Sequence, residues 1–536
     1  MKTTRCLWLF RFLAVLFGGF QAGILTHAQQ LNTIGVTLLR TEVTNADGAG
    51  ISVAQPEAGY PDFEVNPANS SVRQPASLFT YVGSNGMANV FPNSLGTESG
   101  HADTVAGFFY GLPGGIATNV AHVDNFDANY FYTGIVASAL PTNINDPVVN
   151  QSFIFGYVPG QVSVSQQQQI DSQWDNYAAA YATLFISGAG NGGPGSGSVS
   201  PPSTCYNGLS VAAYGYANSS VGPTEDNGRA KPDITAPASA TSFSTPQVSG
   251  AAAVLMQTAL RGDGGNNTNA AADIRTIKAL LLNGAVKPMD WTNTPPSPLD
   301  PRYGAGILNV FNSYEQLAGG KHGYVTATSV PAGGAHPPDG ATGTIASLSG
   351  WDFNTNTSGN TSDEINHYHF NVTNGINGTT FAATATLVWN RQQNETGINN
   401  LNLFLYNAAT SNLVASSTSL VDNVEHIFLP HLAPGRYDLQ VWKAGGIPRM
   451  NIVSASETYA VAWEFSSTIL AAVPSGGNLL LSWPVYPDGF NLASANSLTP
   501  PVAWNTSNPV PVVTNGQNQV LITATNADQF FRLQPP

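Results

Sequence analysis

A serine, Ser242, stands where an expected buried helix begins, just before the apolar run 251–256. The positive end of a helix dipole and its free N–H groups favour a nucleophilic hydroxyl there and can receive an oxyanion. Pro246 is expected in the first turn, where an N–H has no intrahelical partner, and Gly250 allows close packing. On this stretch alone, an ordinary helix-capping serine is an equally good interpretation.

A nucleophilic serine needs a base and an orienting acid, which other parts of the chain must bring to it. Residues 29–318 contain two histidines, His101 and His122. His101 lies beside small residues at an expected strand–helix junction, which favours it as the base. His122 alternates with apolar residues as in a strand, so its alternative role is that of a core or surface histidine.

The candidate acid is Glu57, because it ends an expected buried strand, and functional sites of α/β sheets gather at strand ends. Asp62 and Asp103 are the rival carboxylates. Asn191 lies in a glycine-rich turn after another buried strand, where its amide N–H₂ could complete an oxyanion hole with the backbone N–H of Ser242. Taken by itself, a plain turn asparagine is the better interpretation of Asn191.

Apolar strands alternate with helices over about residues 30–318, which predicts an α/β domain with a mostly parallel sheet and helices on both faces. After residue 320, short alternating strands separated by Gly, Pro and Asn turns predict an antiparallel β-sandwich. The expected strands of the first part are 51–59, 147–153, 184–186 and 209–213, and its expected helices are 100–109, 169–181, 242–256 and 273–285.

The length of 536 residues predicts several domains. Basic residues before a short apolar run, followed by a small-x-small site ending at Ala28, indicate a secretory signal peptide. The alternative, a membrane anchor, needs about 20 apolar residues, which this run lacks. We therefore expect a signal peptide at 1–28, an α/β domain at 29–318, a β-sandwich at 319–467 and a small β module at 468–536.

The amino-acid composition limits the classes of binding partner and the cellular location that we expect. The net charge of −14, with few basic residues, argues against binding to nucleic acid or to an anionic membrane. Signal cleavage would leave Cys205 as the single cysteine, so the mature chain has no internal disulfide. We expect a secreted protein, extracellular or periplasmic, that is monomeric and does not insert into a membrane after signal cleavage.

Two histidines of the expected sandwich, His367 and His369, share one face of a strand and could begin a metal site. No third ligand is evident in the sequence, so surface histidines are the favoured interpretation, and no metal ligand is assigned. Asp363 and Glu364 could help to bind Ca²⁺, but no recognisable ligand loop accompanies them. No cofactor is assigned, and Ca²⁺ is left open.

The ordered motifs resemble those of the subtilisin-like serine peptidases, the subtilases. The resemblance covers about residues 45–315 and implies a subtilisin-like fold. Its motifs, in chain order, are 53–59 for the acid, 101–107 for the histidine, 188–192 for the oxyanion hole, 231–237 before the serine, 241–250 for the serine, and 303–309 at the close. The segment 319–467 is similar to pre-peptidase C-terminal β-sandwich domains.

The resemblance implies a role for each candidate residue. Ser242 attacks the scissile carbonyl, His101 moves the proton, Glu57 orients the imidazole, and Asn191 binds the oxyanion. One strand aligns with the wall of the family's substrate cleft. Its residues are Asn150, Gln151, Ser152 and Phe153.

The sequence departs from the family at several points. Glu57 stands where the family has aspartate, and Ala240 stands where a glycine usually precedes the serine motif. Alanine at position 240 would be strained if the backbone there needed a positive φ. The loop from Pro237 to Ser242 is short, and fewer than twenty residues after the signal leave no room for the family's folding pro-domain.

These observations predict a secreted serine endopeptidase that hydrolyses peptide bonds of protein or peptide substrates through an acyl-enzyme, with a Glu-His-Ser triad. The alternative is a catalytically inactive pseudo-peptidase that serves as a secreted binding or adhesion protein. The departures at Glu57 and Ala240 are the features on which the choice depends.

Overall fold

The computed structural model describes most of the chain after residue 26. The expected signal peptide therefore lies outside this part, except for its last two positions. Within the described ranges, no helix is both long and apolar enough to cross a membrane. The described ranges are 27–156, 161–331, 343–357, 362–373, 381–443, 453–467, 470–475, 477–485, 490–499, 502–506, 508–514, 517–523 and 529–534.

The first part of the chain forms an eight-stranded sheet in the order β10-β9-β8-β7-β1-β6-β3-β4. Every neighbouring pair is parallel except β3 and β4, which are antiparallel. The mostly parallel sheet expected from the alternating pattern is confirmed. Its strands are β1 (Ser52–Glu57), β3 (Phe79–Val82), β4 (Ala88–Val90), β6 (His122–Asp127), β7 (Val148–Gln151), β8 (Leu184–Gly188), β9 (Leu209–Tyr214) and β10 (Ile234–Pro237).

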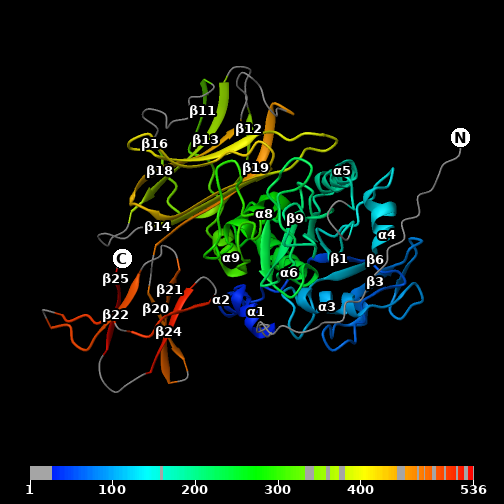
Figure 1. The fold of residues 1–536 in the computed structure, drawn as a ribbon, viewed down its shortest axis with the longest axis horizontal. Helices are drawn as coiled ribbons and strands as arrows, with labels where there is room; N and C mark the ends of the chain where they lie inside the picture. Colours follow the sequence, from blue (N-terminus) through cyan, green and yellow to red (C-terminus); the bar gives the residue numbers. More distant parts are fainter. Residues whose placement is uncertain are drawn as a thin grey trace.

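Helices surround this sheet (Figure 1). Each of the four expected helices is present, and three of them begin or end at other residues than the sequence pattern predicted. The helices of this part are α1 (His27–Thr33), α2 (Val36–Glu42), α3 (Gly100–Phe109), α4 (Ala128–Tyr130), α5 (Val164–Tyr181), α6 (Thr241–Arg261), α7 (Thr268–Ala271), α8 (Ile274–Asn283) and α9 (Val310–Ala318). Further elements are the 3-10 helix η1 (Ala76–Leu78), the π-helix η2 (Phe131–Val136) and the strand pair β2 (Asp62–Glu64) and β5 (Thr97–Glu98).

Strand β7 fixes which helices lie on which face. Successive side chains of a strand point to opposite faces. Asn150 accepts a hydrogen bond from Ser249 of α6 at 2.9 Å, whereas the next residue, Gln151, accepts one from the indole of Trp174 in α5 at 3.0 Å. Helices α5 and α6 therefore cover opposite faces of the sheet, as expected.

The strand order reverses between β1 and β7. From β1 the chain continues to β3 and β6 on one side, then passes to β7 and builds β8, β9 and β10 on the other. Ligand crevices in open α/β sheets lie at such a switch point, outside the carboxyl ends of the strands. Glu57 ends β1 and Gln151 ends β7, so both lie at that position.

Helix α6 runs through the interior and packs against β7, β8 and β9. Its small residues allow this: a Cβ added at Gly250 would lie 2.7 Å from Cβ of Ile116, closer than packed carbons approach. Pro246 is the sixth residue of α6, so the prediction that it lies in the first turn is wrong.

The expected β-sandwich consists of two antiparallel sheets. Their facing side chains form one core that includes Tyr368, Leu403, Leu439, Leu387 and Trp463. One sheet has the order β11 (Thr326–Pro331), β13 (Ser362–Val372), β18 (Gly435–Lys443), β15 (Leu401–Asn407) and β16 (Asn412–Ser417). The other has the order β12 (Ser349–Thr357), β19 (Ser456–Ser467), β14 (Phe381–Trp389) and β17 (Val424–Leu432).

The second of these sheets packs directly on the α/β part through α8 and α9 (Figure 1). Asn283 of α8 accepts hydrogen bonds from Thr384 at 3.0 Å and Thr386 at 2.9 Å. The indole of Trp351 donates to the carbonyl oxygen of Leu317 at 3.1 Å. Apolar residues of this sheet belong to the same core cluster as the parallel sheet, so the contact is a shared core and not a loose linkage.

The last part of the chain forms two small antiparallel sheets around a core of four buried residues. These are Leu481, Trp483, Leu492 and Val520. The strands are β20 (Ala471–Ser475), β21 (Asn478–Pro484), β24 (Gln517–Thr523), β23 (Val512–Thr514), β22 (Asn491–Ala495) and β25 (Phe530–Gln534). The boundary expected at 318/319 lies between α9 and β11, and the one expected at 467/468 lies between β19 and β20. Both boundaries stay predictions.

Candidate active site

Glu57 and His101 meet at the carboxyl edge of the parallel sheet. Glu57 is the last residue of β1 and is buried, while His101 is the second residue of α3 and its side chain is 34% exposed. The Oε2 atom of Glu57 lies 2.9 Å from Nδ1 of His101. Burial acts to lower the pKa of His101, but the charge and hydrogen bond of Glu57 outweigh it, so this pKa is raised above its ordinary value.

A second residue of the same strand face holds the carboxylate in place. Gln55 donates from Nε2 to Oε1 of Glu57 at 2.9 Å and to the carbonyl oxygen of Ala102 at 3.0 Å. The hydroxyl of Tyr110 in turn donates to Oε1 of Gln55 at 2.6 Å. Neither Gln55 nor Tyr110 was predicted from the sequence. The spacing of two residues between Gln55 and the acid could have indicated Gln55, because it places both side chains on one face of the strand.

The rival residues have other partners. Asp62 is exposed and accepts a hydrogen bond from Thr97. Asp103 is buried and accepts from the backbone N–H of Asn66 at 2.7 Å. Burial raises the pKa of Asp103 to about 7.

The rival base, His122, lies at the opposite edge of the sheet. It pairs with Ser52 in the register of β6 and β1, at the end of β1 away from Glu57. Five residues of strand separate the two positions, or roughly 16 Å. Among the candidates, the structure therefore brings Glu57 to His101 and leaves His122, Asp62 and Asp103 apart from that pair.

Ser242 is the second residue of α6, and its side chain is half-buried. The next residue, Phe243, lies with its ring centroid 5.9 Å from that of His101, so the start of α6 is beside the imidazole. In this structure the Ser242 hydroxyl donates to the carbonyl oxygen of Ser152 at 3.5 Å, a long hydrogen bond. Such bonds in ligand-free sites commonly rearrange when substrate binds.

Pro246 and Ser152 together determine what the Ser242 carbonyl oxygen bonds to. In a regular helix this oxygen would accept from the N–H four residues later, but residue 246 is proline and has none. The hydroxyl of Ser152 donates to it instead, at 2.9 Å. This bond joins the residue after β7 to the first turn of α6.

Asn191 caps the same helix from outside. Its Oδ1 accepts from the backbone N–H of Thr241 at 3.0 Å and from the Thr241 hydroxyl at 3.1 Å. With the amide oxygen so occupied, the amide N–H₂ is directed to the other side. Ala240, which precedes the helix, has φ −163°, an extended conformation open to any residue, so the strain considered for alanine at this position does not arise.

The residues expected to line the cleft differ in exposure. Asn150 and Gln151 are fully buried and use their side chains to hold α6 and α5. Ser152 is also buried and bonds to α6, while Phe153 is half-buried and packs edge-on against Phe155 at 6.1 Å between centroids. Phe153 and the backbone of this strand are therefore the parts placed to face a substrate.

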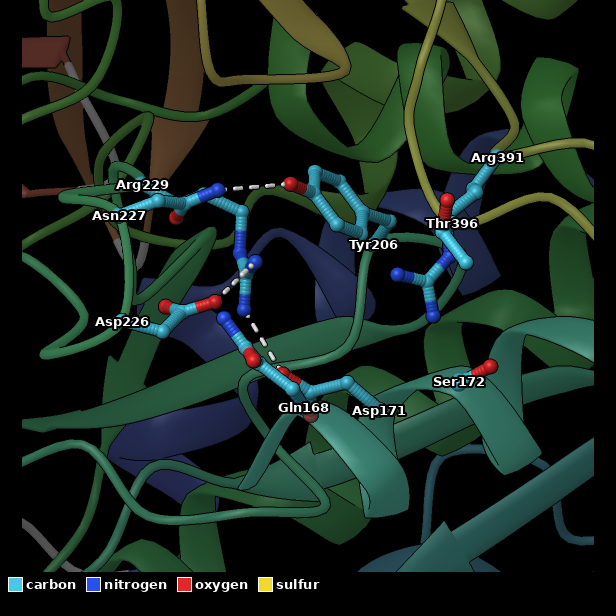
Figure 2. A pocket seen from close by; sticks show the side chains of 9 residues that line it. All are labelled: Gln168, Asp171, Ser172, Tyr206, Asp226, Asn227, Arg229, Arg391 and Thr396. Atoms are coloured by element: carbon cyan, nitrogen blue, oxygen red, sulfur yellow. Dashed lines mark hydrogen bonds and ion pairs between the residues drawn. The ribbon is translucent and has the colours of Figure 1, made fainter. Parts of the chain in front are cut away.

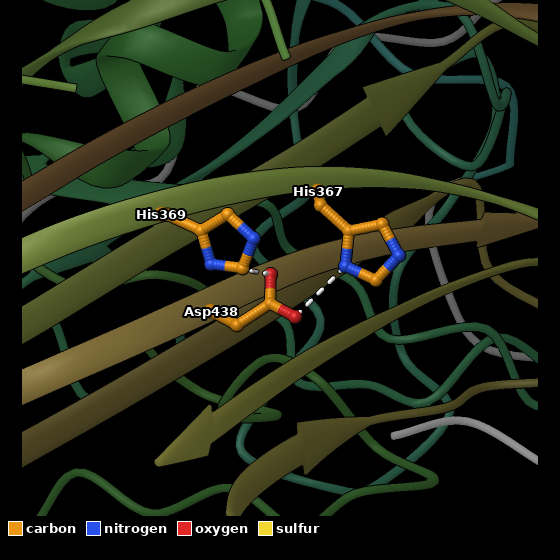
Figure 3. Close-up of side chains that lie close together, drawn as sticks. All are labelled: His367, His369 and Asp438. Atoms are coloured by element: carbon orange, nitrogen blue, oxygen red, sulfur yellow. Dashed lines mark hydrogen bonds and ion pairs between the residues drawn. The ribbon is translucent and has the colours of Figure 1, made fainter. Parts of the chain in front are cut away.

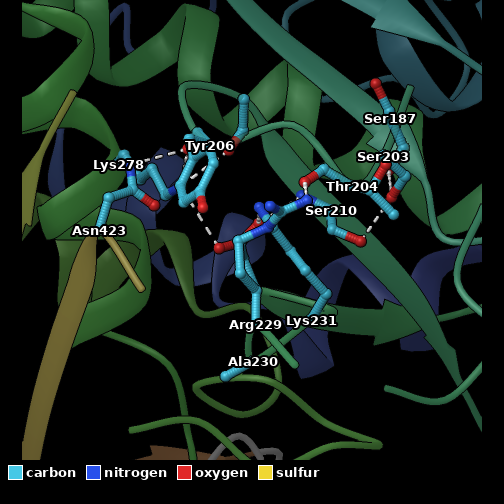
Figure 4. Close-up of polar contacts among 12 residues, drawn as sticks. Ser187, Ser203, Thr204, Tyr206, Ser210, Arg229, Ala230, Lys231, Lys278 and Asn423 are labelled. Carbon is cyan, nitrogen blue, oxygen red and sulfur yellow. Dashed lines mark hydrogen bonds and ion pairs between the residues drawn. The ribbon is translucent and has the colours of Figure 1, made fainter. Parts of the chain in front are cut away.

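The stretch that leads into α6 is held by a buried ionic cluster. Lys231 lies 2.6 Å and Lys278 lies 3.3 Å from the carboxylate of Asp233. Burial acts to raise the pKa of Asp233, but the two ammonium groups outweigh it and lower this pKa. Lys278 also donates to the carbonyl oxygen of Tyr206, as does Asn423 of the sandwich, so this point joins both parts of the chain (Figure 4).

A cavity of about 230 Å³ lies away from these residues, between α5 and a loop of the sandwich. Figure 2 shows Tyr206 between the guanidinium groups of Arg229 and Arg391, which lie 4.2 and 5.1 Å from its ring centroid. Arg229 pairs with Asp171, and Arg391 with Asp175, each at 2.8 Å. The Arg391–Asp175 pair joins the two parts of the chain, and neither ion pair contains a candidate catalytic group.

Comparison with known proteins supports the peptidase interpretation. Residues 81–306 match the model of the subtilase family. The matched subtilase segment contains His101, Asn191 and Ser242, whereas Glu57 precedes it.

Several solved structures are similar to parts of the chain. The protease domain of PatA is 21% identical, with a TM-score of 0.36, over 52% of this chain and 98% of that one. Sphericase is 20% identical, with a TM-score of 0.36, over 52% and 98% of the two chains. The serine protease of Aeromonas sobria is 14% identical, with a TM-score of 0.37, over 85% and 90%. A search of curated proteins finds no match.

Proposed function

We propose that this chain is a secreted serine endopeptidase that hydrolyses peptide bonds through an acyl-enzyme, with Glu57, His101 and Ser242 as its triad. The observation that carries the proposal is the 2.9 Å contact between Glu57 and His101 beside the start of α6. A carboxylate, an imidazole and a hydroxyl from three separate segments are the groups that acyl transfer requires.

The catalytic role of each residue follows from the hydrogen bonds that its atoms already make. Glu57 bonds Nδ1 of His101, so Nε2 is the nitrogen left to accept a proton from the Ser242 hydroxyl. Ser242 attacks the scissile carbonyl, and the imidazolium then protonates the leaving amine. A water molecule, deprotonated by His101, then attacks the acyl-enzyme, and the imidazolium returns the proton to Ser242 as the acyl group is released. Glu57 keeps the imidazole in the correct tautomer and stabilises its charged form.

The oxyanion formed in each step needs hydrogen-bond donors. The backbone N–H of Ser242 belongs to the first turn of α6, where such groups have no intrahelical partner. The amide N–H₂ of Asn191 is the second donor, because its oxygen is held by Thr241. One donor of this kind contributes roughly 3 kcal/mol to transition-state stabilisation.

A second function, that of a pseudo-peptidase that binds proteins without cleaving them, is favoured by one observation. The Ser242 hydroxyl bonds the carbonyl oxygen of Ser152 in the described structure, not the ring of His101. If this arrangement persisted with a peptide in the cleft, the serine would not be activated. The two functions therefore differ in the reactivity of Ser242.

A fluorophosphonate probe, which labels activated serines, separates the two functions. The full chain is treated with the probe beside Ser242→Ala and Ser84→Ala, the latter removing an exposed serine between β3 and β4 that is not a candidate catalytic residue. The peptidase predicts labelling of the wild type and of Ser84→Ala, and none of Ser242→Ala. Absence of labelling in a well-folded wild type would contradict the peptidase and support the binding protein.

A further inference from the structure

Two histidines and one aspartate gather on the face of the first sandwich sheet that is turned away from the core between the two sheets (Figure 3). His367 and His369 are two residues apart on β13, and Asp438 lies directly opposite His369 on β18. Gln440 lies opposite His367 in the same register. These four positions form a square on one face of two neighbouring strands, because alternate residues of a strand point the same way.

The ring nitrogens and the carboxylate are close together. The Nδ1 atom of His367 lies 2.8 Å from Oδ2 of Asp438, and Nδ1 of His369 lies 3.7 Å from Oδ1. One ligand atom from each residue can be chosen so that all lie within 4.8 Å of one another. The two imidazole rings are nearly parallel, with an angle of 14° between their planes.

The cluster is fully buried, yet much of its hydrogen-bonding capacity is unused. All three side chains have 0% exposure. In the described part of the chain, Nε2 of His367, both ring nitrogens of His369 and Oδ1 of Asp438 have no hydrogen-bond partner. Buried polar atoms are nearly always paired, so several orphans in one place indicate a missing ligand.

A neighbouring side chain of the carboxylate also suits a metal site. Gln440 donates from Nε2 to Oδ2 of Asp438 at 2.8 Å. A hydrogen bond of this kind to a ligating carboxylate is the usual outer-shell support of a metal site.

We propose that His367, His369 and Asp438 bind a divalent transition-metal ion, with Zn²⁺ as the best fit. Two imidazoles and one carboxylate are a ligand set that Zn²⁺ accepts, whereas Ca²⁺ prefers oxygen ligands alone. Zinc binds such atoms at about 2.0–2.2 Å, so the side chains must move closer together by rotation about their own bonds. The sequence had located only two of these ligands, because the third lies 69 residues further along the chain.

The ion would join β13 to β18. This sheet is the one that does not carry the contacts with α8 and α9, so the site is separate from the candidate active site. Its expected effect is stability of the sandwich and not a step in catalysis. Metal binding to the folded chain should therefore raise the unfolding temperature.

The test uses the full chain after removal of metal with a chelator. Zn²⁺ is added while heat of binding and unfolding temperature are measured, and Co²⁺ is added separately for its visible absorption. We expect one Zn²⁺ per chain at this site, a higher unfolding temperature, and the absorption bands of tetrahedral Co²⁺ with nitrogen ligands. The Co²⁺ spectrum is read on the wild type, so it does not depend on the folding of a variant.

Variants identify the ligands. His369→Gln should abolish binding, and Gln440→Leu should weaken it by about 10–100-fold, the usual cost of losing outer-shell support. His122→Gln is the matched control, because His122 also pairs with an aspartate, Asp124, but outside the cluster. A stripped, folded wild type that binds neither ion would overturn the proposal, as would binding that persists unchanged in His369→Gln.

Discussion

At the scale of single residues, the acid of the site is a glutamate with one methylene more than aspartate. The contact to His101 is nevertheless 2.9 Å, because the side chain is held by Gln55 two residues earlier on the same strand. Gln55 donates to the other oxygen of the carboxylate and so restrains this longer side chain.

Glu57→Gln should lower kcat by about 10⁴-fold while the fold persists, as an amide in place of the triad carboxylate favours the wrong imidazole tautomer. Peptide hydrolysis and circular dichroism measure the two effects. Asp62→Asn is the control, because Asp62 bonds Thr97 and not the imidazole. A loss of activity in Asp62→Asn with activity retained in Glu57→Gln would mean that Asp62 is the acid.

The pH profile should follow His101. The base must be neutral to accept a proton, so kcat/KM should fall as pH drops through its pKa, which Glu57 raises above the ordinary value. Removing the carboxylate takes away the stabilisation of the imidazolium, so the acidic limb of any residual activity of Glu57→Gln should move to lower pH. An unmoved limb would show that another group controls the profile.

Asn191→Asp separates the two roles of this residue. Aspartate keeps an oxygen for the N–H of Thr241 but loses the N–H₂ donor, so kcat should fall by about 10²–10³-fold while the unfolding temperature changes little. Asn191→Ala, which loses both groups, should lower kcat similarly and also reduce stability. Equal activity of Asn191→Asp and wild type would exclude an oxyanion role.

At the scale of elements, the start of α6 depends on a proline and a serine from different segments. The carbonyl oxygen of Ser242 loses its helical partner at Pro246 and accepts from Ser152 instead. An unpaired buried carbonyl costs about 1–3 kcal/mol, so this exchange matters for stability. The same hydrogen bond ties the residue after β7 to the first turn of α6, which carries Ser242.

Ser152→Ala should therefore lower the free energy of unfolding by about 1–3 kcal/mol. Pro246→Ala restores an N–H to the helix, so adding it to Ser152→Ala should recover part of this loss. Denaturant unfolding of both single variants and the double variant measures the coupling, expected at roughly 1 kcal/mol. Additive effects would mean that the proline and the serine act independently.

At the scale of the whole molecule, the sandwich and the α/β part share buried charged groups as well as apolar core. Lys287 lies with Nζ 5.2 Å from the ring centroid of Trp291 and 5.4 Å from that of Phe428, a sandwich residue. Burial lowers the pKa of Lys287 to about 7. The interface thus contains a lysine that is partly neutral near neutral pH.

Lys287→Met should remove a pH dependence of stability. The folded state of the wild type binds fewer protons than the unfolded state between pH 7 and the usual lysine pKa of 10.5, so its stability rises with pH over this range. The slope is at most about 1.4 kcal/mol per pH unit. Unfolding temperatures from pH 7 to 9 should climb less in Lys287→Met; equal slopes would contradict a neutral buried lysine.

The sequence by itself determined the mostly parallel sheet, the sandwich and the segments that carry Glu57, His101, Asn191 and Ser242. These depend on local periodicity and on short motifs, which neighbouring residues specify. It could not choose among the carboxylates by distance, and it placed Pro246 in the first turn of α6, whereas Pro246 is the sixth residue of that helix.

Tertiary structure alone decided which side chains meet. In the folded chain Gln55 bonds Glu57 and Tyr110 bonds Gln55. The Ser242 carbonyl oxygen accepts from the Ser152 hydroxyl. Asp438 lies close to both His367 and His369. Each of these contacts joins residues on different elements or in adjacent strands whose register is fixed only when the sheet forms. Residue types give the chemistry a site can perform, and the packing of distant segments decides whether its parts come within bonding distance.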